Sequence, residues 1–215
     1  MKYKYIFFDL DGTLTDSQKG IVNCIKYALE SFGINETDES KFQKFLGPPL
    51  INSFQKFCGF SKEQAQAALN KYRERFSTIG LFENRVYDGV PEMLQELVNG
   101  GHRLVLATSK PLVYAERIMV KYGLRPYFKL LCGAELDGTR DEKAEVIEYA
   151  IEKLGCPRDQ IIMVGDREND ILGAKKCGIA CCGVRYGYAA PGELEAAGAD
   201  YIADTVEQLG QILLA

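Results

Sequence analysis

Two aspartates one residue apart, Asp9 and Asp11, follow the apolar stretch KYIFF within the sequence FFDLDGTLTDS. Two carboxylates this close repel each other, so the arrangement calls for positive charge beside them. A divalent cation bound by oxygen atoms would relieve that repulsion. The pair is therefore the first candidate for chemistry, although an Asp and a Gly after a strand also fit a plain turn.

Two further apolar stretches run into polar groups. RLVLATSK (103–110) ends in two hydroxyl groups and a lysine, and IIMVGDREND (161–170) carries Asp166 and Asp170. If these strands neighbour the first one in a parallel sheet, the carboxylates of Asp9, Asp11 and Asp166 and one or two hydroxyl groups meet at one edge. Mg²⁺ suits such a set, because it takes few carboxylates and keeps waters and phosphate oxygens as its other ligands.

A carboxylate beside Mg²⁺ can also act as a nucleophile on a phosphate ester. Enzymes accelerate phosphate monoester hydrolysis by up to roughly 10²¹-fold, and the site needs a nucleophile, a general acid, a metal ion and positive charge near the phosphoryl oxygens. Asp9 and Asp11 can divide the first two roles. Gly12 lets the backbone turn closely around the phosphate, Thr108 donates a hydrogen bond to it, and Lys143 supplies the charge.

The elements that would position these residues alternate along the chain. Apolar runs typical of buried parallel strands occupy 4–8, 103–108, 161–165 and 179–184, with weaker ones at 128–133 and 200–203. Helical patterns occupy about 91–100, 112–123, 141–154, 168–177 and 192–197. This alternation predicts an α/β fold, a Rossmann-like three-layer core with a mainly parallel sheet, in which sites form at the carboxyl ends of the strands.

One segment breaks the alternation. Residues 17 to about 80 show no strand signal, and their apolar residues recur at helical spacing. They predict an α-helical bundle cap, inserted after the first strand and lying above the strand ends. The expected domains are therefore a core of residues 1–15 and 89–215 and a cap of residues 16–88.

Composition narrows the class of protein. The 215 residues carry a net charge of −4 and no basic run, which argues against a nucleic acid polymer as partner. No apolar stretch is long enough to span a membrane, and the seven cysteines in irregular spacing read as reduced thiols of a cytoplasmic protein. His102 is the only histidine, so a Ser/His triad or a multi-histidine zinc site has little support. The sequence leaves the oligomeric state open.

DLDGT (9–13), the Thr108-Ser109 pair, Lys143 and GDREND (165–170) together resemble the four motifs of the haloacid dehalogenase superfamily. The helical insert resembles the small α-helical cap of that superfamily. The strings FDLDGTLTDS, ATSKP, GTRDEKAEVIEYAI and GVRYGY are similar to those of phosphoglycolate phosphatases and 5′-nucleotidase-like hydrolases.

This resemblance implies a role for each acidic residue. Asp9 would be the nucleophile and a Mg²⁺ ligand. Asp11 would protonate the leaving group, then activate water, and offer its backbone carbonyl to the metal. Asp166 would bind Mg²⁺ directly. Asp170 would hold a metal-bound water, or support the metal ligands without contacting the metal itself.

The resemblance also implies a phosphate-binding set. Gly12, Thr108, Ser109 and Lys143 would hold the phosphoryl group, with Lys110 as the rival for the lysine role. In the GVRYGY string the two tyrosines are expected to pack within a loop, and Arg185 is a further candidate for contact with the phosphate.

The function predicted from these residues is a Mg²⁺-dependent phosphatase. It would hydrolyse small phosphorylated metabolites through an aspartyl-phosphate, in a phosphoglycolate phosphatase-like or 5′-nucleotidase-like way. One alternative is a phosphosugar mutase of the same superfamily. Another is a receiver-like module phosphorylated on aspartate, which the helical insert argues against.

Overall fold

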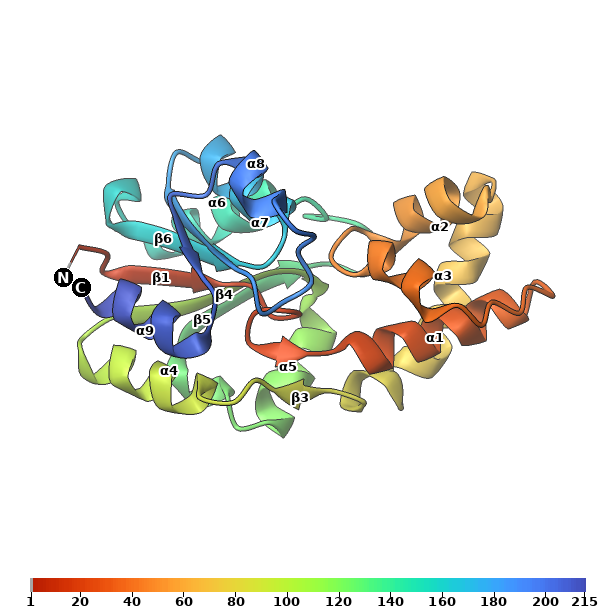
Figure 1. Ribbon diagram of the computed structural model, residues 1–215, viewed down its shortest axis with the longest axis horizontal. Helices are drawn as coiled ribbons and strands as arrows, with labels where there is room; N and C mark the ends of the chain where they lie inside the picture. The colour runs from red at the N-terminus through yellow and green to blue at the C-terminus, as the bar shows by residue number, and fades with distance from the viewer. Residues whose placement is uncertain (1) are drawn as a thin grey trace. The chain divides into compact units, whose positions relative to one another are not determined.

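The computed structural model describes residues 2–215, which include a six-stranded sheet. Its strands are β1 (Tyr5–Phe8), β4 (Arg103–Pro111), β5 (Phe128–Ala134), β6 (Ile161–Gly165), β7 (Ala180–Val184) and β8 (Tyr201–Ala203). They lie in the order β5-β4-β1-β6-β7-β8, and every neighbouring pair is parallel (Figure 1). The chain order reverses at β1, which is where open α/β sheets form their sites.

The register places three strand ends side by side. Phe8 of β1 pairs with Leu106 of β4 on one side and with Val164 of β6 on the other. Because these strands are parallel, the residues that follow each of them emerge at the same edge of the sheet. All four residues of β1 are buried, and so are the five of β6, since helices cover both faces of the sheet.

Helices form a layer on each face of the sheet (Figure 1). One layer contains α6 (Lys143–Leu154), α7 (Glu168–Lys176) and α8 (Glu193–Ala197). The other contains α4 (Val90–Asn99), α5 (Leu112–Lys121) and α9 (Val206–Leu214). Each helix packs through an apolar stripe, such as Val146, Ile147 and Ala150 of α6. The predicted three-layer α/β core with a parallel sheet is thus confirmed.

Some local structure differs from the sequence prediction. Strand β4 runs on to Pro111 instead of ending at Thr108. Helix α9 was not predicted, although Thr205 caps it by accepting a hydrogen bond from the backbone N–H of Gln208. Short 3₁₀ helices, η3 (Arg125–Tyr127) and η4 (Arg158–Gln160), precede β5 and β6.

The chain separates into two compact units. One comprises the chain up to Asp16 and Val86–Ala215, and the other is Ser17–Arg85. The sequence prediction had set these crossings near residues 16 and 88. Two-residue strands, β2 (Thr15–Asp16) and β3 (Arg85–Val86), pair at the crossings. Strand β3 therefore falls inside the range 16–88 that was expected to be free of strands.

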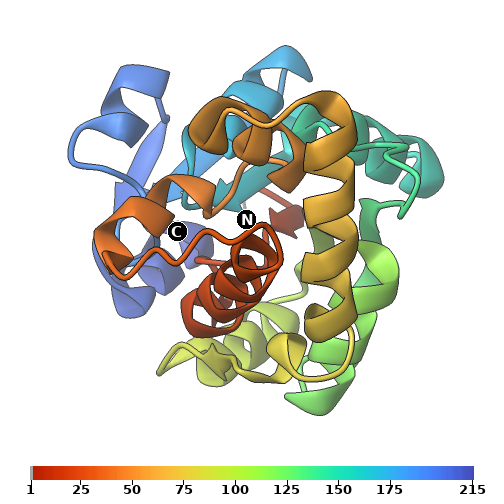
Figure 2. The same cartoon turned by 90° about the vertical axis from the view of Figure 1, so that its right-hand side faces the viewer.

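The second unit is helical (Figure 2). It contains α1 (Gln18–Glu30), η1 (Glu39–Phe45), α2 (Leu50–Cys58), α3 (Lys62–Phe76) and η2 (Gly80–Phe82). Its core includes Ile25 of α1, Phe42 and Phe45 of η1, and Phe54 of α2. An ion pair between Arg75 and Glu83 ties the end of α3 to the segment after η2.

None of the helices within residues 2–215 combines the length and apolar character that crossing a bilayer requires. The seven cysteines are thiols, and all but Cys58 are buried. Burial raises the pKa of the Cys132 thiol to about 11, so this group stays neutral at ordinary pH.

Candidate active site

A tight turn after β1 presents the two aspartates of the first motif. The backbone N–H of Asp9 donates to the carbonyl of Val164 at 2.9 Å, and that of Gly12 donates to the carbonyl of Thr15 at 2.7 Å. Gly12 has a φ of +80°, and a Cβ at this position would lie 2.1 Å from Oδ2 of Asp166. Glycine is required on both counts, because a side chain here would displace a carboxylate of the site.

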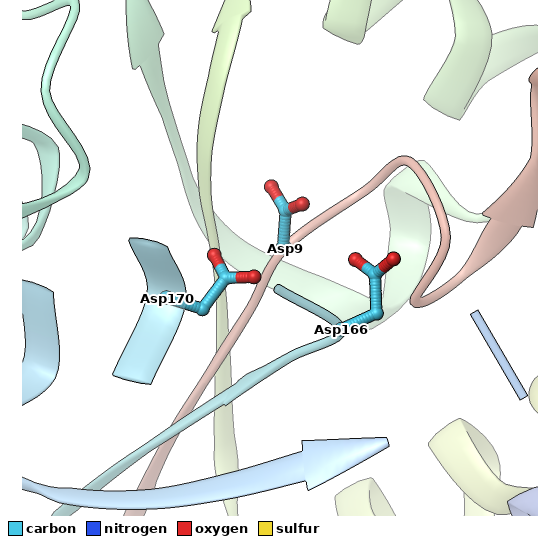
Figure 3. Close-up of side chains that lie close together, drawn as sticks. All are labelled: Asp9, Asp166 and Asp170. Atoms are coloured by element: carbon cyan, nitrogen blue, oxygen red, sulfur yellow. The ribbon is translucent and has the colours of Figure 1, made fainter. Parts of the chain in front are cut away.

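Three carboxylates meet at this edge of the sheet (Figure 3). Asp9 follows β1, Asp166 follows β6, and Asp170 lies in the first turn of α7; one oxygen of each falls within 4.8 Å of the others. The side chain of Asp11 is not part of this group. Asp9, Asp11 and Asp166 were expected to converge; Asp9 and Asp166 do, whereas the third carboxylate of the group is that of Asp170, from the helix.

Lys143, the first residue of α6, reaches into the acidic group. Its Nζ lies 2.7 Å from Oδ1 of Asp9 and 2.8 Å from Oδ1 of Asp170, and donates to the carbonyl of Ala107 at 3.0 Å. The side chain is 5% exposed. Gly173 makes room for it, since a Cβ there would lie 2.9 Å from Cγ of Lys143.

The electrostatics of this group favour a cation. Burial lowers the pKa of Lys143, but the charges of Asp170 and Asp9 outweigh it, so the pKa is raised and the ammonium persists. Burial, together with repulsion from Asp170 and Asp9, raises the pKa of Asp166 well above its usual range. Burial also raises the pKa of Asp170, although Lys143 opposes it. One lysine thus does not compensate the three carboxylates.

Two backbone contacts and one hydroxyl hold the acidic side chains in place. Oδ1 of Asp166 accepts from the Thr13 hydroxyl at 3.3 Å, and Oδ2 accepts from the backbone N–H of Tyr188 at 2.8 Å. Oδ2 of Asp170 accepts from the backbone N–H of Arg167 at 3.0 Å. Both oxygens of Asp166 are therefore oriented by the protein.

The loop after β7, which contains Tyr186 and Tyr188, is part of this support. A Cβ on Gly187 would lie 2.3 Å from the Gly12 carbonyl oxygen and 2.4 Å from Cβ of Asp166. The Tyr186 hydroxyl donates to the carbonyl of Thr13 at 3.0 Å. This role was not predicted from the sequence; the available signal was a glycine between two tyrosines shortly after a strand.

The second aspartate of the motif has a different partner. Oδ2 of Asp11 lies 2.7 Å from Nζ of Lys110, whose side chain is 6% exposed. Oδ1 of Asp11 is buried and has no hydrogen-bond partner within residues 2–215. The two rival lysines thus occupy separate positions: Lys143 lies against Asp9, and Lys110 lies against Asp11.

Thr108 is buried in β4, and its hydroxyl oxygen accepts from the backbone N–H of Lys110 at 3.2 Å. That contact leaves the hydroxyl proton available to a ligand. Ser109 follows it and is partly buried. Arg185 does not join this group, because it pairs with Glu195 and Asp204.

His102 lies before β4, at the opposite end of that strand from Thr108. Its Nδ1 is 2.8 Å from the carbonyl oxygen of Tyr3. It is buried, and its place agrees with a structural role.

The acidic group fits a hard divalent cation. Its three side chains offer only carboxylate oxygens, the ligands that Mg²⁺ prefers. Oδ1 of Asp170 is buried and has no hydrogen bond within the described residues, although Nζ of Lys143 is near enough for an ion pair. An oxygen of this kind gains most from a cation.

Residues 6–184 match the model of the haloacid dehalogenase-like hydrolase family. The chain belongs to this family. The resemblance that the sequence motifs indicated is therefore confirmed.

Named relatives of this haloacid dehalogenase-like hydrolase span most of its length. A 5′-nucleotidase of Pseudomonas aeruginosa is 44% identical over 99% of this chain and 96% of its own. The tyrosine-protein kinase PtkA of Mycobacterium tuberculosis is 36% identical over 85% of this chain and 62% of its own. A phosphoglycolate phosphatase of Vibrio parahaemolyticus is 28% identical over 98% of this chain and 96% of its own.

A solved structure described as a predicted phosphatase from Clostridium acetobutylicum superimposes with a TM-score of 0.96. It is 44% identical and covers 100% of this chain and 99% of its own. The predicted enzyme class, a phosphoric monoester hydrolase of this superfamily, is confirmed.

Proposed function

We propose that the protein is a Mg²⁺-dependent phosphatase of small phosphorylated metabolites that works through an aspartyl-phosphate on Asp9. The observation that carries this proposal is the contact of Lys143 with both Asp9 and Asp170, beside Asp166. A buried carboxylate that has a lysine ammonium group at its side and a candidate metal site next to it is suited to attack an anionic ester.

Asp9 attacks the phosphorus atom, and a bond forms between its carboxylate oxygen and phosphorus. Lys143 and the Thr108 hydroxyl face the phosphoryl oxygens and hold them for this attack. The carboxylates of Asp9, Asp166 and Asp170, with the backbone carbonyl of Asp11, would hold Mg²⁺. When bound, the ion supplies charge neutralisation at the phosphoryl oxygens.

Asp11 transfers the protons. Its carboxyl group gives a proton to the ester oxygen as the bond from phosphorus to that oxygen breaks. The resulting carboxylate then takes a proton from the water that releases phosphate from Asp9. Both steps need a carboxyl oxygen that faces the reacting atoms, and Oδ1 of Asp11 has no partner within the described residues.

The substrate class is inferred from the named relatives. A 5′-nucleotidase and a phosphoglycolate phosphatase suggest nucleoside 5′-monophosphates and phosphoglycolate as the first compounds to test. We assign the choice between them to the helical unit Ser17–Arg85, in the role of a cap.

The test is phosphate release from a panel of nucleoside monophosphates, phosphoglycolate and sugar phosphates, in Mg²⁺ and in EDTA. We expect turnover of at least one compound in Mg²⁺ only, and none with Asp9→Asn. Asp159→Asn, an exposed aspartate in η4, is the matched control and should keep full activity. Equal rates in EDTA, or substantial activity of Asp9→Asn, would refute the mechanism.

The same panel separates the mutase alternative. A phosphosugar mutase would convert a sugar phosphate into its isomer in the presence of a sugar bisphosphate, with little net release of phosphate. Isomer formation that exceeds phosphate release would contradict a phosphatase.

A further inference from the structure

Strand β4 is irregular at its carboxyl end. Its pairing with β5 shifts register between Thr108, which faces Gly133, and Pro111, which faces Ala134. A Cβ on Gly133 would lie 2.7 Å from the carbonyl oxygen of Lys110. The glycine in β5 therefore permits the bulge that brings Lys110 to the site.

From this bulge Lys110 contacts two other residues of the site. Its backbone N–H donates to the Thr108 hydroxyl oxygen at 3.2 Å. Its Nζ lies 2.7 Å from Oδ2 of Asp11, and the two side chains are only 6% and 16% exposed. A substitution of the side chain would remove the second contact and leave the first, because the first uses the backbone.

We propose that Lys110 is a positioning residue for the proton transfers of Asp11, an inference that rests on the proposed function. An ammonium group carries only donors, so the carboxyl oxygen that faces it acts as an acceptor and cannot point a proton toward it. Lys110 thereby directs the acidic proton of Asp11 to the other oxygen, Oδ1, which is buried and without a hydrogen-bond partner in the described part of the chain.

The proton balance follows from this orientation. Oδ1–H of Asp11 gives its proton to the ester oxygen, which keeps the electron pair of the breaking bond to phosphorus. In the second step, water attacks phosphorus, its proton passes to Oδ1, and the bond between Asp9 and phosphorus breaks. Oδ2 stays against Lys110 throughout, so the carboxyl group does not rotate between the steps.

The competing role for Lys110 is a direct contact with the phosphoryl group. The two roles predict different couplings between Lys110 and Asp11. A residue that acts through Asp11 has no further effect once Asp11 cannot transfer protons, whereas a phosphate ligand acts independently of it.

The experiment is a double-mutant cycle of Lys110→Met and Asp11→Asn. The readout is kcat/KM, in Mg²⁺, for p-nitrophenyl phosphate and for the best alkyl phosphate of the panel. Methionine keeps an unbranched apolar stem, and Lys110→Arg tests rescue by another cation. Lys129→Met, at an exposed lysine of β5, is the control. Thermal unfolding of each variant checks that it is folded.

For the alkyl ester we expect Lys110→Met to lose roughly 10- to 10²-fold, part of the roughly 10²- to 10⁴-fold that proton transfer contributes. The aryl ester, whose leaving group needs little protonation, should lose less than about threefold on the same grounds. Lys110→Arg should recover part of the loss, and the double variant should match Asp11→Asn alone.

Three results would overturn the inference: additive losses in the double variant, equal losses for both esters, or no loss with Lys110→Met. Additive losses would assign Lys110 to the phosphate instead. An inactive wild-type protein would refute the proposed phosphatase function itself. This outcome differs from failure of the Lys110 inference alone, in which the wild type is active and the losses of the two single variants add in the double variant.

Discussion

Substitution of Lys143 by methionine should destabilise the metal-free protein. The ammonium group is 5% exposed and lies 2.7 Å from Asp9 and 2.8 Å from Asp170. Removing one partner of a buried ion pair typically costs about 3–5 kcal/mol, because the other charge remains buried without compensation. Here two carboxylates lose the same partner, so we expect the upper part of that range for the loss in unfolding free energy.

The defect should depend on pH in a direction that the pKa shifts define. Burial raises the pKa of Asp170 and, with the neighbouring carboxylates, that of Asp166. A carboxyl whose pKa is raised by folding is neutral below its folded pKa and charged above it. The loss in unfolding free energy caused by Lys143→Met should therefore reach its full size at high pH, and should shrink as pH falls through these raised pKa values.

The assay is urea unfolding followed by circular dichroism, in EDTA, at pH 8 and pH 5. Lys129→Met is the control for loss of a lysine elsewhere. The double variant Lys143→Met/Asp170→Asn should recover part of the loss, since both members of one pair are removed. Saturating Mg²⁺ should narrow the difference from the wild type, because the variant lacks the competing ammonium group, binds the cation more tightly and is therefore stabilised more by it.

Two results would refute this reasoning. One is a Lys143→Met variant within about 1 kcal/mol of the wild type at pH 8 in EDTA, well short of the cost of breaking a buried pair. The other is a defect of equal size at pH 5 and pH 8, which would mean that unpaired carboxylate charge is not its cause.

Two more predictions concern other parts of the chain. Gly187→Ala should weaken Mg²⁺ binding about 10- to 100-fold by calorimetry, because the added Cβ would press on Asp166. The control is Gly210→Ala, where the added atom meets only an ordinary contact at 3.5 Å. Unchanged affinity of Gly187→Ala would contradict the supporting role assigned to the loop after β7. Glu83→Gln should cost about 1 kcal/mol of unfolding free energy at pH 7, because the hydrogen bond from Arg75 lowers the pKa of Glu83 despite its burial. That contribution is present above the ordinary pKa of 4.5 and is lost as pH falls through the lower folded value, so a difference from the wild type that persists at pH 2 would contradict it.

The strands that carry the site could be predicted from the sequence because they are buried on both faces. Such strands appear as continuous apolar runs, and the residue after each run is then a candidate for the site. Asp9 after β1 and Asp166 after β6 were found in this way. Helix α9 was overlooked, although Val206, Leu209 and Leu213 recur at helical spacing in its sequence.

The contacts that support the site could not be predicted from the sequence, because they join segments that are far apart in it. The backbone N–H of Tyr188 donates to Asp166. Because almost every residue has a backbone N–H, the residue type at position 188 does not reveal this contact. The absence of space around Gly187 likewise depends on where Gly12 and Asp166 come to lie.

The sequence by itself determined the class of fold, the acidic residues and the reaction they suit, since these depend on residue type and local order. Which lysine serves which aspartate was decided only by the tertiary structure. Lys110 and Lys143 both stood as phosphate-binding candidates in the sequence, yet the bulge in β4 takes one to Asp11, and the start of α6 takes the other to Asp9. The physical reason is that an ion pair depends on a distance of a few ångströms between side chains, and here the order of the strands and the register between them set that distance.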